Sequence, residues 1–346
     1  MRVRILGAGI VGLACADELV GRGHDVVVVD PAPGSGASFA AAGMLCPGGE
    51  AWHGEDDLLA LCLEGVALWP EYAGRLGVPL TRTGTLLVGR DHGDLQLVER
   101  QAELLAGAGV AIQPLTRREL LAAEPGLDPR AAGGAVLPHD QAVDPRAVVA
   151  ALLARLGERV VSPGSPAAVP AEVEVLATGA RLPAPYDALV RGVRGEILRV
   201  ATDDPPAHVV RGWARGEPVY VVPRPGTREV VIGATSEEHD EPPVATVGGV
   251  RRLLLAAVDL VPALDRAELV EVTARDRPGT PDNLPLVGPS GDDGVLLAAG
   301  HHRHGVLLAP LTAVRLADHL ESGAVDARLD PRRFSPSPPT TEGSTR

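Results

Sequence analysis

The chain contains no lysine; all 32 of its basic residues are arginine. A pyridoxal-phosphate enzyme binds its cofactor through a lysine Schiff base, so the sequence excludes that class. A phosphate-binding loop of the Walker type would also lack its lysine. The absence of lysine therefore excludes two common ways in which enzymes bind phosphorylated ligands.

Cysteine is scarce, and long apolar runs are absent. The three cysteines are Cys15, Cys46 and Cys62, and an odd number at these spacings fits neither a disulfide framework nor a zinc site. We therefore expect reduced thiols in a cytoplasmic protein. The sequence contains no run of about 18 apolar residues, so no membrane span is predicted. The apolar N-terminus differs from a secretory signal, because Asp17 and Glu18 lie within it and cleavage would remove the glycine motif described below.

The chain has fewer basic than acidic residues: 32 arginines and 45 acidic residues give a net charge of −13. Nucleic acid and anionic membrane surfaces both attract basic patches, so neither is expected as a main partner. A small anionic substrate stays compatible with this charge, because single arginines still bind carboxylates. The 346 residues are enough for about two domains of roughly 150 residues each.

The apolar pattern predicts an α/β fold that begins with a βαβ unit. This unit consists of strands at residues 3–6 and 25–29 with a helix at 10–22 between them. Further helices are predicted at 56–75, 95–106, 116–123, 144–157, 250–261 and 306–321, and further strands at 173–177, 195–202, 219–223, 229–235, 269–275 and 295–299.

This order of elements predicts a nucleotide-binding domain that is split in the sequence. We expect it to comprise residues 1–50, 130–190 and 276–330, with a β-sheet-rich substrate domain at 51–129 and 191–275 that covers the ligand. Residues 331–346 are rich in Pro, Ser and Thr and are predicted to be a disordered tail.

The run Gly7-Ala8-Gly9-Ile10-Val11-Gly12 matches the pattern G-x-G-x-x-G between a predicted strand and a predicted helix. Gly7 permits the tight turn, Gly9 lets the backbone approach a pyrophosphate, and Gly12 allows close packing of helix on strand. The helix N-terminus then presents N–H groups to phosphate. Asp30 ends the second strand, where an acidic residue accepts hydrogen bonds from a ribose. The motif alone does not separate FAD from NAD.

A segment of small residues follows the second strand and favours a flavin. Residues 35–44 read Ser-Gly-Ala-Ser-Phe-Ala-Ala-Ala-Gly-Met in the sequence. Small side chains let the backbone pass close to a bulky cofactor.

Several motifs occur in one order and resemble a known family. They are the glycine fingerprint, the alanine-rich run before Met44, Ala177-Thr178-Gly179, Arg277-Pro278-Gly279-Thr280 and the glycine- and histidine-rich residues 300–310. Together they resemble the D-amino-acid oxidase superfamily of FAD-dependent oxidoreductases, and within it the thiamine-pathway glycine oxidases, over about residues 2–320. The resemblance implies a Rossmann-like FAD-binding domain.

The resemblance also implies which residues contact FAD. They are Gly7, Gly9, Ile10, Val11, Gly12, Asp30, Pro31, Ser38, Ala41, Ala42, Gly43, Met44, Thr178, Gly179, Gly300, His302, Arg303, His304, Gly305 and Val306. Some relatives attach flavin through a late cysteine, but none occurs after Cys62, so non-covalent FAD is expected. The segment at residues 160–173 is shorter than the pair of strands that contacts the adenine in the family.

For the substrate, the resemblance implies that Arg277 binds the carboxylate of an amino acid and that Arg303 lines the same pocket. The planar fork of arginine suits this task because it bonds both carboxylate oxygens. Tyr220 is expected to reach the carboxylate with its hydroxyl, and Met44 to wall the pocket. No metal is expected, because the spacing of the nearby histidines is not a zinc pattern. No catalytic acid or base is predicted either, because hydride transfer from a neutral amine depends on positioning.

The implied function is oxidation of glycine, and of sarcosine or small D-amino acids, to the imine and 2-oxo acid. O₂ would accept the electrons and give H₂O₂, and the imine dehydroglycine would serve thiazole synthesis for thiamine. A thiazole synthase is then an expected partner, and the family suggests a homo-oligomer.

Three other functions stay open on the residues alone. The first is an oxidase for sarcosine, another N-methyl amino acid or a larger D-amino acid. The second is a flavin-linked dehydrogenase that passes electrons to a quinone or carrier. The third is a non-catalytic protein that binds NAD or FAD as a structural ligand or sensor.

Overall fold

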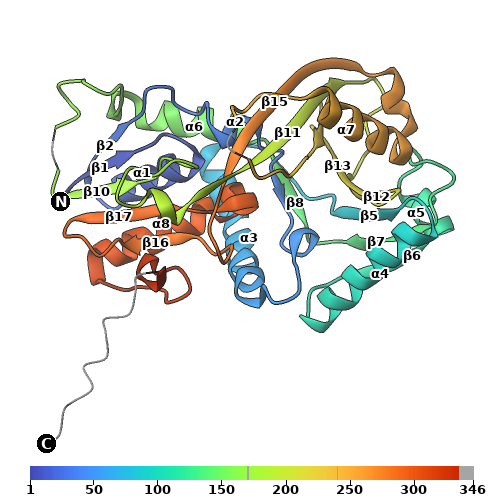
Figure 1. Ribbon diagram of the computed structural model, residues 1–346, viewed down its shortest axis with the longest axis horizontal. Helices are drawn as coiled ribbons and strands as arrows, with labels where there is room; N and C mark the ends of the chain where they lie inside the picture. The colour runs from blue at the N-terminus through green and yellow to red at the C-terminus, as the bar shows by residue number, and fades with distance from the viewer. Residues whose placement is uncertain (170, 240, 335–346) are drawn as a thin grey trace, which may run out of the picture.

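The computed structural model describes residues 1–169, 171–239 and 241–334 of the chain. It contains two large sheets, one on each side of the view in Figure 1, and the two long strands β11 and β15 run between the two sides. No helix among the described residues is long and apolar enough to cross a membrane.

The first sheet has six strands in the order β16-β17-β10-β1-β2-β9. They are β1 (Arg2–Leu6), β2 (Asp25–Val29), β9 (Val160–Val161), β10 (Val173–Leu176), β16 (Leu286–Pro289) and β17 (Val295–Ala299). Five of these strands run parallel and β16 is antiparallel. With helix α1 (Ile10–Gly21) between β1 and β2, the predicted βαβ unit is confirmed.

The second sheet has eight strands in the order β15-β11-β14-β13-β12-β5-β7-β6. They are β5 (Thr85–Gly89), β6 (Gln113–Thr116), β7 (Gly133–Leu137), β11 (Arg191–Ala201), β12 (Val209–Ala214), β13 (Glu217–Pro223), β14 (Glu229–Gly233) and β15 (Glu268–Gly279). Helices α4 (His92–Gly107), α5 (Arg117–Ala123) and α7 (Val247–Leu260) contact its strands. A third, small sheet joins β3 (Met44–Leu45), β8 (Gln141–Val143) and β4 (Leu80–Thr81).

Four strands of the second sheet were not predicted, namely β5, β6, β7 and β12. Glycine weakens the apolar pattern of two of them, for a reason that only the folded chain reveals. A Cβ on Gly212 of β12 would overlap the carbonyl oxygen of Val88, and one on Gly134 of β7 would overlap that of Leu87. The missing side chains therefore allow these backbones to approach closely.

Two predicted domain boundaries differ from the sheets that the strands join. The boundary at residue 130 assigned β7 to the nucleotide-binding part, yet β7 pairs with β5 and β6 in the eight-stranded sheet. The boundary at 276 cuts β15, which stays paired with β11 as far as Gly279. The division into two domains is otherwise still a prediction.

Helix starts depend on capping side chains. The predicted capping box of Thr116 and Glu119 is present at α5, and Asp144 caps α6 (Pro145–Leu156) as expected. Helix α4 starts three residues earlier than predicted, where Asp91 accepts a hydrogen bond from the Asp94 N–H at 3.0 Å. Its first turn is polar, so apolar periodicity does not reveal it.

The predicted disordered tail is wrong over its first four residues. Residues Pro331–Phe334 form a 3₁₀ helix in which Pro331 is buried. Arg333 holds this turn through an ion pair with Asp282 at 2.7 Å and a hydrogen bond to the Leu284 carbonyl at 2.7 Å. The remainder of the predicted tail, residues 335–346, lies outside the described residues.

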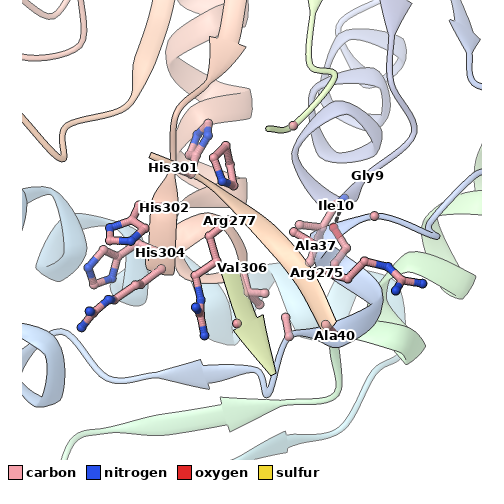
Figure 2. A pocket seen from close by; sticks show the side chains of 18 of the residues that line it. Gly9, Ile10, Ala37, Ala40, Arg275, Arg277, His301, His302, His304 and Val306 are labelled. Atoms are coloured by element: carbon pink, nitrogen blue, oxygen red, sulfur yellow. Dashed lines mark hydrogen bonds between the residues drawn. The ribbon is translucent and has the colours of Figure 1, made fainter. Parts of the chain in front are cut away.

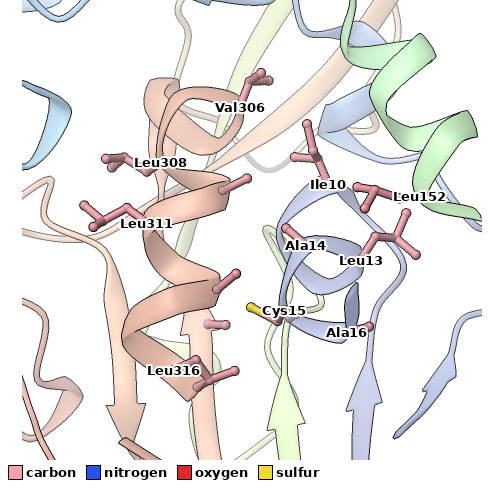
Figure 3. Close-up of a cluster of buried hydrophobic side chains, with 14 of the residues drawn as sticks. Ile10, Leu13, Ala14, Cys15, Ala16, Leu152, Val306, Leu308, Leu311 and Leu316 are labelled. Atoms are coloured by element: carbon pink, nitrogen blue, oxygen red, sulfur yellow. The ribbon is translucent and has the colours of Figure 1, made fainter. Parts of the chain in front are cut away.

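The main apolar core joins helix α1 to helix α8 (Gly305–Ser322) and includes residues of α3 (Asp56–Leu76) and α6. Figure 3 shows α1 and α8 side by side, with Ile10 and Val306, which lie in their first turns, at the same end. Apolar packing in this core therefore brings two helix N-termini to one place, where the ligand cavity lies.

Candidate functional site

A cavity of about 780 Å³ extends from the first β–α turn to the strands of the second sheet (Figure 2). Its volume lies within the range of roughly 300–1,000 Å³ that is usual for small-molecule and cofactor sites. Both sheets contribute to its wall, together with the first turns of α1 and α8.

The cavity brings together almost all the residues predicted to bind cofactor or substrate. Its lining includes Gly7, Gly9, Ile10, Val11, Asp30, Pro31, Ser38, Ala41, Ala42, Gly43, Met44, Thr178, Gly179, Tyr220, Arg277, His302, Arg303, His304, Gly305 and Val306. Gly12 and Gly300 do not line it. The part that each residue plays in binding is still a prediction.

The glycines of the fingerprint stand where a side chain has no room. Gly7 has φ +108°, and a Cβ on it would overlap the Ala177 carbonyl oxygen. A Cβ on Gly12 would overlap the Gly7 carbonyl oxygen, so Gly12 supports the turn from behind the cavity. At Gly9 the nearest atom to such a Cβ is Ser38 Oγ, 3.4 Å away. These positions fit a dinucleotide that approaches the backbone at Gly9.

Asp30 and Ser38 are held by backbone N–H groups at this end of the cavity. The Asp30 carboxylate accepts hydrogen bonds from Ala8 N at 2.6 Å and Ala32 N at 2.7 Å. A carboxylate has about four lone-pair sites, so Asp30 keeps the capacity to accept ribose hydroxyls. Ser38 Oγ accepts a hydrogen bond from Ile10 N, at the start of α1, at 3.0 Å.

The alanine-rich segment is fixed by two contacts that connect it to β8 and β13. Gly43 has φ +79°, and a Cβ there would overlap the Val143 carbonyl oxygen. The buried Arg224, which directly follows β13, donates hydrogen bonds to the carbonyl oxygens of Ala42 at 2.7 Å and Val143 at 3.3 Å. Sequence reasoning missed Arg224, although it follows the strand of Tyr220.

The histidine-rich segment turns sharply into α8. Gly300 has φ +73° and packs against Thr280, which explains why it lies outside the cavity wall. Burial lowers the pKa of His301 to about 3, and burial together with Arg303 and Arg277 lowers that of His302 to about 3. Both rings are therefore neutral at ordinary pH. No group of three or more potential metal ligands occurs among the described residues.

Arg277 and Tyr220 enter the cavity from strands β15 and β13, each over a glycine. The Arg277 guanidinium donates hydrogen bonds to the Thr235 carbonyl at 3.1 Å and the Arg194 carbonyl at 3.4 Å. A Cβ on Gly195 would lie 2.5 Å from Arg277 Cζ, and one on Gly233 would lie 2.6 Å from Tyr220 Cε2. These two glycines were missed, although glycine in an apolar strand signals close approach.

Arg211 and Glu50 form a second pair that sequence reasoning missed. Arg211 Nη1 donates a hydrogen bond to Glu50 Oε1 at 2.7 Å, and both residues line the cavity. Burial alone would raise the pKa of Glu50. The electrostatic effect of Arg211, together with those of His304 and Arg303, is larger and lowers the pKa to about 2. Glu50 is therefore a permanent negative charge beside the predicted substrate residues.

A buried carboxyl lies behind the cavity wall at Cys46. Burial raises the pKa of Asp140 to about 7, and its Oδ2 atom has no hydrogen-bond partner among the described residues. Cys46 lines the cavity, and its thiol lies 3.2 Å from the Thr85 hydroxyl. Asp140 itself does not line the cavity.

Comparison with known proteins identifies the family to which the chain is similar. The family model described as "FAD dependent oxidoreductase" matches residues 2–319. The chain is 34% identical to the glycine oxidase of Geobacillus kaustophilus over 92% of both chains. It is 32% identical to the bifunctional protein ThiO/ThiG of Trichormus variabilis over 94% of its own length, but spans only 53% of that protein. The structure is also similar to the crystal structure of the glycine oxidase from Geobacillus kaustophilus, with a TM-score of 0.84 and 31% sequence identity. The two structures align over 96% of this chain and 98% of that one.

Proposed function

The chain belongs to the family of FAD dependent oxidoreductases, and we propose that it is an amino-acid oxidase of the glycine oxidase type. The observation that carries this proposal is the position of Arg277 in the cavity beside His302 and Val306 (Figure 2). Tyr220 lines the same cavity, close enough to Arg277 for the guanidinium to influence its hydroxyl. The relatives named glycine oxidase support the same substrate class.

We assign the glycine fingerprint and Asp30 to the pyrophosphate and ribose of non-covalent FAD. The alanine-rich segment and the start of α8 would lie against the flavin ring, where the N–H groups of the first turn favour negative charge. The cavity fits this assignment, because glycine backbone without side chains lines its nucleotide end. When bound, FAD supplies the two-electron acceptor for oxidation of the bond between the substrate Cα and nitrogen.

We assign the substrate carboxylate to Arg277 and Tyr220, with Arg303 at the exposed rim and Met44 as a wall. No strong base is needed for this chemistry, and the neutral His302 ring is a weak one. These residues would hold the Cα in one position and exclude water from it. Positioning of this kind lowers a barrier without an acid or base at the reacting carbon.

The proposed overall reaction converts glycine, O₂ and water into glyoxylate, ammonia and H₂O₂ by way of the imine. Sarcosine and small D-amino acids are the proposed further substrates. The relative named ThiO/ThiG supports a place in thiamine synthesis, where a thiazole synthase would use the imine. We further propose a cytoplasmic homo-oligomer.

The test is anaerobic reduction of the purified protein. A visible flavin spectrum that bleaches with glycine would support both the cofactor and the reaction. A flavin spectrum that bleaches only with sarcosine, D-alanine or D-proline would contradict the glycine assignment and favour the alternative oxidases. A protein that releases no flavin on denaturation would contradict the proposal as a whole.

A further inference from the structure

One row of paired residues crosses the floor of the substrate end. Arg211 of β12 pairs with Tyr220 of β13, Tyr220 pairs with Gly233 of β14, and Gly233 pairs with Ile197 of β11. Directly paired residues in antiparallel strands point their side chains to the same face of a sheet. Arg211 and Tyr220 therefore face the cavity together, and both line it.

Glu50 lies at this row through its bond to Arg211. It ends the 3₁₀ turn Gly48–Glu50, and only 12% of its side chain is accessible. Its Oε1 atom accepts the Arg211 hydrogen bond at 2.7 Å, and its other oxygen accepts none from the described residues. Because a carboxylate offers about four acceptor sites, Glu50 has capacity left for a ligand.

The charges on the cavity wall leave one group of the substrate without a counterpart. An amino acid carries a carboxylate and an amine, and the proposed function assigns only the carboxylate, to Arg277 and Tyr220. Among the described lining residues, the acidic ones are Asp30, at the nucleotide end, and Glu50, at the substrate end. Glu50 thus supplies the negative charge that matches an ammonium group.

We propose that Glu50 binds the amine of the amino-acid substrate, so that the two ends of the zwitterion are held by Glu50 and Arg277. This inference rests on the proposed function. Glu50 is a binding residue and not a base, since a carboxylate with so low a pKa does not remove a proton from an ammonium group. The same oxygen accepts an N–H from the charged and the neutral amine, so the contact persists when the proton leaves.

Glu55 provides a matched control. It is also a glutamate, five positions further along the chain, and it accepts a hydrogen bond from Asn283 Nδ2 at 2.7 Å. It does not line the cavity. A Glu55→Gln variant therefore removes a negative charge near the cavity but leaves every residue of the cavity wall unchanged.

The test compares glycine with acetate, which keeps the carboxylate and lacks the amine. Glycine affinity is measured from the concentration dependence of anaerobic flavin reduction, and acetate affinity by titration calorimetry with the flavin-loaded protein. We expect Glu50→Gln to weaken glycine binding about tenfold or more, the effect of losing a hydrogen bond to a charged group. Acetate should bind as well as before or more tightly, because a repelling charge is gone. Glu55→Gln should change neither.

The outcomes separate the two proposals. Parallel losses for glycine and acetate would show that Glu50 only holds Arg211, and an unchanged glycine affinity would also overturn the inference. A Glu50→Asp variant, which keeps the charge, guards against a folding defect and should retain most of the preference for glycine. A wild-type protein that no amino acid reduces would instead overturn the proposed function, and the inference with it.

Discussion

Replacing Gly195 by alanine should impair substrate binding without unfolding the protein. The new Cβ would lie 2.5 Å from Arg277 Cζ, whereas carbon atoms in ordinary contact are about 3.5–4.0 Å apart. The guanidinium must therefore move by about 1 Å, and a displacement of that size can lower the rate about 100-fold. Arginine is long and flexible, so the backbone of β11 does not have to shift. We expect kcat/KM for glycine to fall about 100-fold, measured by stopped-flow flavin reduction together with steady-state turnover.

The control for this prediction lies on the same strand. A Cβ on Gly192 would meet Asp276 at 3.3 Å and does not approach Arg277. Gly192→Ala should therefore leave glycine turnover nearly unchanged, and the melting temperatures of both variants should stay within a few degrees of wild type. A Gly195→Ala protein with wild-type kinetics would refute the view that Gly195 makes room for a substrate-binding arginine.

Three further changes test other parts of the site. Arg277→Ala should raise KM for glycine about 100-fold, because two charged hydrogen bonds to the substrate are lost. The control Arg130→Ala changes an exposed surface arginine and should leave KM unchanged. An unchanged KM in Arg277→Ala would contradict the assignment of the carboxylate. Gly12→Ala places a Cβ against backbone, so the purified protein should contain much less flavin per chain than wild type, and full occupancy would contradict the fingerprint assignment. Asp140→Asn concerns stability. The pKa of Asp140 is raised to about 7 in the folded protein, so the unfolded chain releases this proton near pH 4 and the folded protein keeps it until about pH 7. The wild type therefore loses stability as pH rises from about 4 to 7, and the loss is complete above pH 7. The free energy of unfolding of the variant relative to wild type should therefore increase by up to about 4 kcal/mol between pH 4 and pH 8, measured by urea unfolding; a difference independent of pH would refute the raised pKa.

The sequence predicts the parts of this site that are local in the chain. The fingerprint, Asp30 and the capping box of Thr116 combine residue types and spacings that act within a few residues of one another. Arg277 and Tyr220 were predicted only through resemblance to a family, and the structure brings them to one cavity.

The rest depends on contacts between distant segments. Glu50 and Arg211 are 161 positions apart, and no local pattern connects a glycine-rich loop to a strand that was itself not predicted. Gly195 and Gly233 matter only because Arg277 and Tyr220 lie above them. Arg224 acts on a carbonyl oxygen 182 positions away. Such partners become apparent only when the register of the eight-stranded sheet is known.

The position of β1 in the six-stranded sheet has a consequence for synthesis on the ribosome. β1 pairs with β10, β10 pairs with β17, and α1 packs against α8, so β1 and α1 find some of their neighbours in segments that are synthesised much later. A nascent chain that stops before Val295 has the glycine fingerprint but neither β17 nor α8, which includes Gly305 and Val306 of the cavity wall. Flavin would therefore be captured only after α8 has emerged, and the cofactor content of truncated chains would report whether α8 had been made.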